Sequence, residues 1–123
     1  MKKTSFLLAA TALALVAGGV QAQPVARNGV LADSTGRTLY IFDKDTPGKS
    51  NCTGGCLTAW PAFVAKPAAK TEGDFDLVVS NGAQQWAFKG KPLYYFAGDA
   101  NPGDRNGDGS GGSWHVVPVA AKY

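Results

Sequence analysis

Two copies of one short aromatic motif constrain this chain more than any other feature of its sequence. The copies, which lie 54 residues apart, are Tyr40-x-Phe42-x-x-Asp45 and Tyr94-x-Phe96-x-x-Asp99. The same spacing relates Trp60 to Trp114. Because unrelated segments rarely match at so many positions in one register, the pattern indicates an internal duplication. We therefore predict two tandem repeats, repeat one over about residues 28–65 and repeat two over about residues 75–119.

Residues 1–22 have the features of a secretory signal peptide. They combine a positive start, an apolar run over residues 6–16 and a small-residue end before Gln23, where we expect cleavage. The run is too short for a membrane-spanning helix, so we predict no transmembrane segment in the mature protein, residues 23–123. No cysteine follows the run to carry a lipid. We expect a periplasmic or secreted protein that is soluble after cleavage.

The charge of the mature chain argues against nucleic-acid partners. The whole sequence has 12 Lys and Arg against 9 Asp and Glu, and two of the basic residues lie in the signal peptide. The mature net charge is therefore +1. The basic residues are scattered along the chain, whereas a nucleic-acid or anionic-membrane surface needs a concentrated basic patch.

Short apolar segments separated by turns rich in glycine, proline and asparagine predict an all-β fold. Residues 38–42 are apolar on both faces, which is typical of a strand covered on both sides. We expect residues 29–33 to form a hairpin with this strand, and residues 23–28 to be a loose leader. Asn81-Gly82 is a strong signal for a second hairpin turn.

The predicted architecture is a single small domain, a sandwich or open barrel made of the two repeats. Gly54-Gly55 limits any helix near residues 55–60 to one short turn. We expect the two tyrosine-bearing strands to pair around a pseudo-twofold axis. Because neither repeat alone could bury its apolar face, we expect one cooperative domain. Residues 66–74, rich in Pro, Ala and Lys, are predicted to be the joint between the repeats.

Further motifs accompany the two copies. They are Lys49-Ser50-Asn51-Cys52-x-Gly54-x-Cys56 with Trp60-Pro61, Lys89-Gly90-Lys91-Pro92-Leu93 before Tyr94, and Gly107-Asp108-Gly109 before Trp114-His115. With these motifs the chain resembles the bacterial secreted repeat of unknown function, also described as a predicted lipoprotein family with a Yx(F/W/Y)xxD motif. The resemblance spans nearly the whole mature chain and implies a small secreted or periplasmic repeat protein, but it supplies no activity. Unlike many members, this chain has no cysteine to acylate near the cleavage site.

The two cysteines, Cys52 and Cys56, predict a disulfide. An exported protein with two cysteines usually pairs them, and this spacing permits a bridge where the segment turns. The alternative is a soft ligand set for copper, made of both thiolates and His115. A thiol-redox role fits less well, because such sites usually have the C-x-x-C spacing beside a βαβ unit.

A calcium loop is a second metal candidate. Asp104, Asn106 and Asp108 match the first positions of the pattern that places oxygen ligands around a tight turn. The twelfth position, where a bidentate glutamate belongs, is His115, so any calcium site would be weak. The alternative is a turn whose side chains bond their own backbone.

For the duplicated motif we predict a structural role. Its aromatic residues are expected in the core, and Asp45 and Asp99 are expected to cap the loops that follow them. The alternative is an aromatic site for a sugar or an organic cation.

No nucleophile elbow, zinc-hydrolase, phosphate-binding or haem motif occurs in the sequence. We therefore predict a non-enzymatic periplasmic or secreted module that binds an unidentified ligand or envelope partner. No cofactor is expected, with calcium as a candidate ion. The alternative is a copper-handling or thiol-redox protein that uses Cys52, Cys56 and His115.

Overall fold

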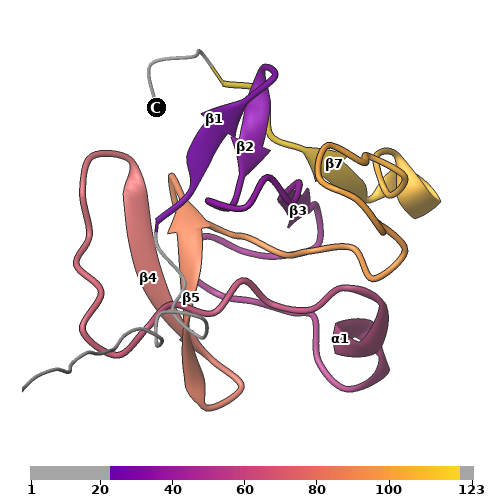
Figure 1. Cartoon of the computed structure of the whole chain (residues 1–123). Coiled ribbons are helices and arrows are strands. Elements are labelled where there is room, and N and C mark those ends of the chain that lie inside the picture. The colour runs from indigo at the N-terminus through magenta and orange to yellow at the C-terminus, as the bar shows by residue number, and fades with distance from the viewer. Residues whose placement is uncertain (1–22, 120–123) are drawn as a thin grey trace, which may run out of the picture.

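The computed structural model describes residues 23–119, so the predicted signal peptide lies outside the described residues. Within this range the fold is mostly β, in three small antiparallel sheets that do not close into a barrel (Figure 1). The all-β prediction is therefore confirmed. The elements are β1 (Val25–Arg27), β2 (Val30–Ala32), β3 (Tyr40–Phe42), α1 (Gly55–Ala59), β4 (Phe75–Ser80), β5 (Ala83–Phe88), β6 (Lys91–Pro92), the 3-10 turn η2 (Ser110–Gly112) and β7 (Trp114–Val116).

Two hairpins, β1–β2 and β4–β5, are closed by Asn-Gly turns. Asn28 and Gly29 have φ values of 54° and 84°, and Asn81 and Gly82 have values of 51° and 81°. Positive φ at both central residues is what a two-residue hairpin turn needs to match the strand twist. The expectation of a loose leader over residues 23–28 was wrong, because the first of these turns folds β1 back onto β2.

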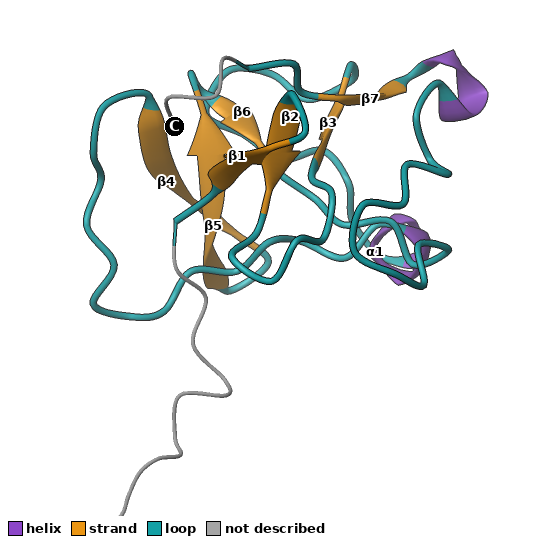
Figure 2. Ribbon diagram, turned by 45° about the horizontal axis from the view of Figure 1, so that its top comes forward, coloured by secondary structure: helices purple, strands orange, loops and turns teal. Residues whose placement is uncertain are grey.

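The hairpin expected between residues 29–33 and 38–42 forms only in part. A single bridge joins Ala32 to Thr38, and the rest of the second segment turns away because β3 pairs with β7 instead. Since β3 belongs to repeat one and β7 to repeat two, their pairing interleaves the repeats. Figure 2 shows β3 and β7 together at one side of the molecule, away from β4 and β5.

The two motif tyrosines pair directly with each other through their backbones. The Tyr40 N–H donates to the Tyr94 carbonyl at 2.8 Å, and the Tyr94 N–H donates to the Tyr40 carbonyl at 3.0 Å. The predicted pairing of the tyrosine-bearing segments is therefore present, and this reciprocal pair marks the centre of the pseudo-twofold arrangement.

The buried side chains form two clusters. The larger one is the main core, which consists of Leu31, Leu39, Phe63, Ala65, Phe75, Trp86, Phe88, Leu93, Tyr95 and Val117. The smaller one, the motif cluster, consists of Tyr40, Cys52, Trp60, Tyr94 and Trp114, with Phe42, Cys56, Leu57, Phe96 and Val116 packed against it. Burial of such apolar area is the main favourable term in folding, and here it depends on side chains from both repeats.

Helical structure is minor, as expected. Helix α1 has five residues and contributes none that is fully buried, and Gly54 at its start takes a φ of 57°. Among the described residues, no helix has the length and apolar character needed to cross a membrane.

Candidate functional site

The motif tyrosines and aspartates bond across the two repeats. The Tyr40 hydroxyl donates to Oδ2 of Asp99 at 2.6 Å, and the Tyr94 hydroxyl donates to Oδ2 of Asp45 at 2.7 Å. Each tyrosine therefore binds the aspartate of the other copy. Because a hydrogen bond to a carboxylate is stronger than one between neutral groups, this crossed pair fastens the repeats to each other.

The remaining carboxylate oxygens organise the loop that follows each motif. Oδ1 of Asp45 accepts the Asn51 N–H at 2.6 Å, and Oδ1 of Asp99 accepts the Asn106 N–H at 2.9 Å. Each aspartate thus links its own loop to the opposite tyrosine. Such side-chain to backbone bonds are typical of Asp at the start of a loop.

Each motif tyrosine hydroxyl also accepts a hydrogen bond from the loop that its partner aspartate organises. In repeat one, the Cys52 N–H donates to the Ser50 hydroxyl, which bonds the Tyr94 hydroxyl. In repeat two, the Gly107 N–H donates directly to the Tyr40 hydroxyl at 3.2 Å. Both tyrosine oxygens therefore accept one bond and donate another, which is the full use of a phenol in a buried site.

The electrostatics of these groups fit a structural role. Burial, reinforced by the bond to Asp99, raises the pKa of Tyr40 well above its ordinary value. Burial likewise raises the pKa of Tyr94. Burial also raises the pKa of Asp45, although the hydrogen bonds from Asn51 and Tyr94 oppose it. Both tyrosines consequently remain protonated donors at neutral pH.

Four motif-cluster rings stack in a row across the two repeats. Trp60 and Trp114 lie at the centre, with ring centroids 3.9 Å apart and planes at 1°. Phe42 stacks on Trp114 at 4.1 Å, and Phe96 lies against Trp60 at 4.5 Å. Each end of the row therefore pairs a phenylalanine of one copy with the tryptophan of the other.

Two glycines are needed because aromatic rings touch their backbone. A Cβ at Gly107 would lie 2.6 Å from Trp60 and 2.9 Å from Phe96, and a Cβ at Gly98 would lie 2.6 Å from Phe96. Both glycines lie in the loop between β6 and η2. Only the fold shows that the loop packs against the aromatic row.

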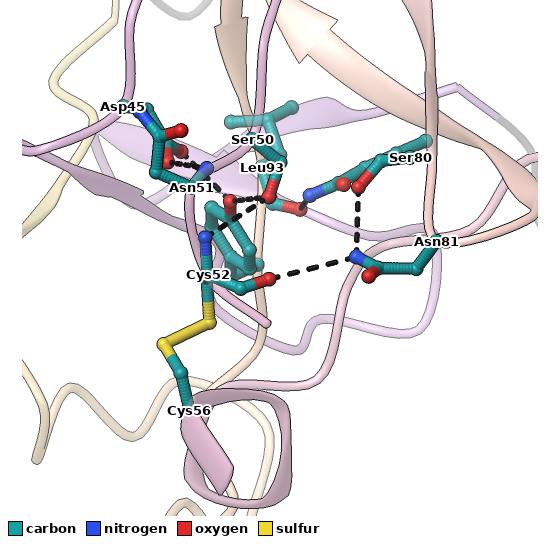
Figure 3. The surroundings of a disulfide bond; sticks show 10 residues. Asp45, Ser50, Asn51, Cys52, Cys56, Ser80, Asn81 and Leu93 are labelled. Atoms are coloured by element: carbon teal, nitrogen blue, oxygen red, sulfur yellow. Dashed lines mark hydrogen bonds between the residues drawn. A yellow bond between two sulfur atoms is a disulfide. The ribbon is translucent and has the colours of Figure 1, made fainter. Parts of the chain in front are cut away.

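Cys52 and Cys56 form a disulfide, with their Cα atoms 5.3 Å apart (Figure 3). Cys52 is fully buried in the motif cluster, and the chain has no other cysteine. The disulfide argues against the thiol-redox alternative, because neither sulfur atom is a thiol. Copper ligation by the two thiolates would require the bond to be reduced first.

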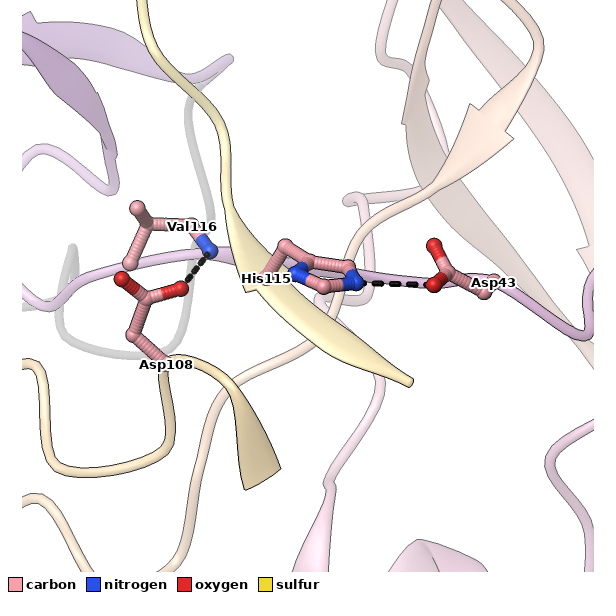
Figure 4. A network of polar contacts seen from close by, with 4 residues as sticks. All are labelled: Asp43, Asp108, His115 and Val116. Carbon is pink, nitrogen blue, oxygen red and sulfur yellow. Dashed lines mark hydrogen bonds and ion pairs between the residues drawn. The ribbon is translucent and has the colours of Figure 1, made fainter. Parts of the chain in front are cut away.

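His115 lies on the outer side of β7 and bonds an aspartate that the sequence did not single out. Its Nε2 atom is 2.7 Å from Oδ2 of Asp43, and both side chains are partly exposed, at 40% and 53% (Figure 4). An exposed pair of this kind adds little to stability. In repeat one the position equivalent to His115 is Pro61, so this pair has no counterpart there.

The acidic loop of repeat two directs its carboxylates toward backbone N–H groups. Oδ2 of Asp104 accepts the N–H groups of Ala100 and Asn101, and Oδ1 of Asp108 accepts that of Val116 at 3.1 Å (Figure 4). Within residues 23–119, no three His, Cys, Asp or Glu side chains form a group that could hold a metal ion. Calcium binding by Asp104, Asn106 and Asp108 stays a prediction.

A further aspartate, Asp33, is buried and was not predicted. Its carboxylate accepts bonds from the Thr35 N–H and hydroxyl, from the Arg37 N–H and from the Tyr95 hydroxyl. Burial raises the pKa of Asp33, but these hydrogen bonds outweigh that effect and leave the pKa below its ordinary value. The sequence signal was present, since Asp33 begins a Ser-Thr-Gly turn.

Two hollows on the described surface lie beside the segment that joins the repeats. One, of about 350 Å³, is lined by Gln23, Lys66, Ala68, Ala69, Lys70, Glu72 and Trp86. The other, of about 610 Å³, is lined by Val64, Ala65, Pro67, Gly82, Ala83 and Gln84. Figures 1 and 2 both show the connection between α1 and β4 arching outside β4.

These features define a disulfide-bonded, all-β protein made of two interleaved tandem repeats, each of which completes the polar and aromatic contacts of the other. Comparison with known families matches residues 26–64 and 78–118 to the secreted repeat of unknown function. The chain belongs to that family, and it is therefore a secreted module whose role the family does not specify. Comparisons with curated proteins and with solved structures find no match.

Proposed function

We propose that the protein is a non-enzymatic binding module, and that its ligand or envelope partner contacts the segment between the repeats rather than the duplicated motif. The motif is a poor candidate for recognition because its groups already have partners. Both tyrosine hydroxyls and both aspartates bond within the protein, and the central tryptophans are 6% exposed.

The observation that carries the proposal is an unpaired donor beside the smaller hollow. Trp86 lines this hollow and is 2% exposed, yet its Nε1–H has no acceptor among the described residues. Buried donors are nearly always paired, and leaving one unpaired costs about 1–3 kcal/mol. Because this atom is shielded from solvent, a ligand would have to displace lining side chains in order to supply an acceptor, and that bond would remove the cost. The hollow also has the size of a small-ligand site, for which volumes of about 300–1,000 Å³ are usual.

The position of the hollow beside Trp86, between the two repeats, also supports it as the binding site. The family match leaves out residues 65–77, and this stretch supplies most of the residues that line the hollow. A segment that differs from the shared scaffold is where specificity is expected, because binding residues concentrate on loops held by a rigid framework.

The experiment is a titration followed by the indole N–H resonances in NMR. Trp86→Phe assigns the Trp86 resonance, and Trp60 and Trp114 provide internal controls in the buried motif cluster. Benzoate, N-acetylglucosamine and a short acidic peptide serve as probes. We expect at least one probe to shift the Trp86 resonance saturably while the two control resonances stay fixed. If every probe left Trp86 unchanged, or moved all three resonances together, the proposed site would be wrong.

A further inference from the structure

Three Asn-Gly pairs occur in this chain, and the fold places them in different surroundings. Asn28-Gly29 and Asn81-Gly82 are the exposed turns of the hairpins β1–β2 and β4–β5. Asn106-Gly107 lies in the loop packed against the aromatic row, and Gly107 is buried. Because the residue after each asparagine is the same, differences in their chemistry must come from the structure.

The backbone nitrogen of the glycine is the group that distinguishes the three pairs. The N–H groups of Gly29 and Gly82 have no acceptor within residues 23–119. The Gly107 N–H donates to the Tyr40 hydroxyl at 3.2 Å, and the Gly107 Cα is held against Trp60 and Phe96. This nitrogen cannot move toward the Asn106 side chain without breaking that bond and displacing the aromatic row.

We propose that Asn28 and Asn81 are sites of spontaneous deamidation and that the motif cluster protects Asn106. In the reaction, the glycine nitrogen loses its proton to the solvent and attacks Cγ of the asparagine. The new C–N bond closes a succinimide as the Cγ–Nδ2 bond breaks, and the leaving group takes up a proton to become ammonia. Water then opens the ring at either carbonyl to give aspartate or isoaspartate, so the sum is asparagine plus water to aspartate plus ammonia.

The side chains of the two reactive asparagines are restrained to different degrees. Nδ2 of Asn81 donates to the Ser80 hydroxyl at 2.9 Å and points at the Cys52 carbonyl at 3.5 Å (Figure 3). The side chain of Asn28 makes no hydrogen bond within residues 23–119, although its carbonyl accepts Arg105. Asn28 should therefore react before Asn81.

The reaction at Asn81 has a structural consequence that the reaction at Asn28 lacks. The carboxylate that replaces the amide has no hydrogen to donate, and its negative charge faces the Cys52 carbonyl oxygen. The contact between the β4–β5 turn and the disulfide segment is then lost. In isoaspartate, an added methylene enters the backbone of a turn that requires two residues with positive φ, which loosens the hairpin further.

Peptide mapping by mass spectrometry tests the proposal on the intact native protein held in mildly alkaline buffer. We expect deamidation at Asn28 first and Asn81 second. Because reaction at Asn106 must first break the Gly107 hydrogen bond and its packing, we expect it to be at least about tenfold slower. In urea, where the fold is absent, the three rates should converge. Equal rates at Asn106 and Asn81 in the folded protein would overturn the protection. If Asn28 and Asn81 reacted in urea but not in the folded protein, the proposal that they are reactive in the native structure would be overturned.

A pair of variants tests the consequence separately. Asn81→Asp reproduces the aspartate product, in which the backbone is unchanged, and should speed hydrogen exchange in the disulfide segment. Asn28→Asp adds the same charge at the other hairpin turn and should leave exchange in that segment unchanged. If both variants or neither changed exchange there, the contact from Asn81 to Cys52 would not be what couples this turn to the disulfide.

Discussion

At the scale of single residues, each copy of the duplicated motif forms its side-chain hydrogen bonds with the other copy. The Tyr40 hydroxyl reaches Asp99, the Tyr94 hydroxyl reaches Asp45, and neither tyrosine bonds the aspartate of its own copy. A crossed arrangement of this kind requires both copies to be present and to be correctly docked. The motif therefore recurs because each copy is a structural partner of the other.

A double-mutant cycle measures the crossed bond. Tyr94→Phe removes the part-buried hydrogen bond to the Asp45 carboxylate, and Asp45→Asn removes the charge of the acceptor. Each should lower the free energy of unfolding by about 1.5–3 kcal/mol. Because the two residues share one bond, the double variant should show a coupling of about 0.5–3 kcal/mol. Urea unfolding provides the measurement. The control cycle combines Tyr94→Phe with Asp99→Asn, which make no bond to each other, and a coupling there as large as in the test cycle would contradict the crossed pairing.

The buried Asp33 predicts how stability changes in acid. Its folded-state pKa lies below the ordinary value, so its contribution is present above the unfolded-state pKa, about 4, and is lost as pH falls through the folded-state pKa. Asp33→Asn should thus be destabilising at neutral pH, and the difference from the native protein should shrink in acid. Urea midpoints at pH values on both sides of this range provide the test, with exposed Asp76→Asn as control. A difference that stayed constant with pH would rule out this linkage.

At the scale of elements, tight loops rather than long strands position the motif cluster. The strands β3 and β7 have three residues each, and the row of four rings is closed at one end by the loop that contains Gly98 and Gly107. Because the rings pack directly against the backbone of these two glycines, neither position has room for a side chain. Gly107 is thereby buried against the rings, although most of the loop around it is exposed.

Gly107→Ala tests this packing. The added Cβ would meet Trp60 at 2.6 Å, and overpacking of this kind typically costs about 1–3 kcal/mol. Gly55→Ala is a matched control, since it has open space around its Cβ and lies in α1, where alanine should stabilise by up to about 1 kcal/mol. Thermal unfolding of both variants gives the comparison. Equal melting temperatures for the two variants would show that the loop can move away from the ring.

We expect the disulfide to raise the free energy of unfolding by a modest but measurable amount. Closing so short a segment between Cys52 and Cys56 contributes about 2 kcal/mol in the loop-entropy treatment. Replacing both cysteines with alanine should therefore reduce the free energy of unfolding by about that amount, with some added loss because Cys52 is fully buried. Urea unfolding with and without reductant measures the effect on the native protein. If reductant also lowered the stability of the double-alanine variant, its effect would not come from the disulfide.

At the scale of the whole molecule, the repeats are interleaved rather than placed side by side. The β3–β7 sheet takes one strand from each repeat, and the motif cluster takes Tyr40 and Trp60 from repeat one and Tyr94 and Trp114 from repeat two. The main core is likewise shared between them. Neither repeat contains a complete core, which makes folding of one dependent on the other.

Cooperativity follows from this interleaving. The mature chain should unfold in a single transition with coincident midpoints by tryptophan fluorescence and far-ultraviolet circular dichroism, as small two-state domains do. Residues 23–70 alone should show no cooperative transition, because β3 would lack β7 and Trp60 would lack Trp114. Mixing residues 23–70 with residues 71–123 should restore structure. A cooperative transition in either half alone would show that the repeats are independent.

Much of the scaffold could be predicted from local signals. Short stretches of sequence were enough to predict the duplication, the hairpin turn at Asn81-Gly82 and the short helical turn near residues 55–60. These features depend on repeat spacing and on turn chemistry between neighbouring residues. The leader was misjudged because β1 is short, and its only local signal is the Asn28-Gly29 turn.

The candidate site was less predictable for a physical reason. The hollow beside Trp86 is formed by a segment of Pro, Ala and Lys that reads as a simple joint, and an unpaired indole N–H is visible only once every neighbouring acceptor is in place. Likewise, the reactivity assigned to Asn28 and Asn81 and the protection of Asn106 depend on where each glycine N–H points. Identical dipeptides cannot reveal that difference.

The sequence alone determined that the chain is duplicated, mostly β and built around two copies of one aromatic motif, because these properties depend on spacing and local turn chemistry. Only the tertiary structure decided that each tyrosine bonds the aspartate of the other copy and that four rings form a continuous row. Two equal copies in one chain permit pairing within a copy or between copies. Pairing between the copies is selected by the long-range docking of β3 against β7 and of Tyr40 against Tyr94. No local pattern specifies that docking.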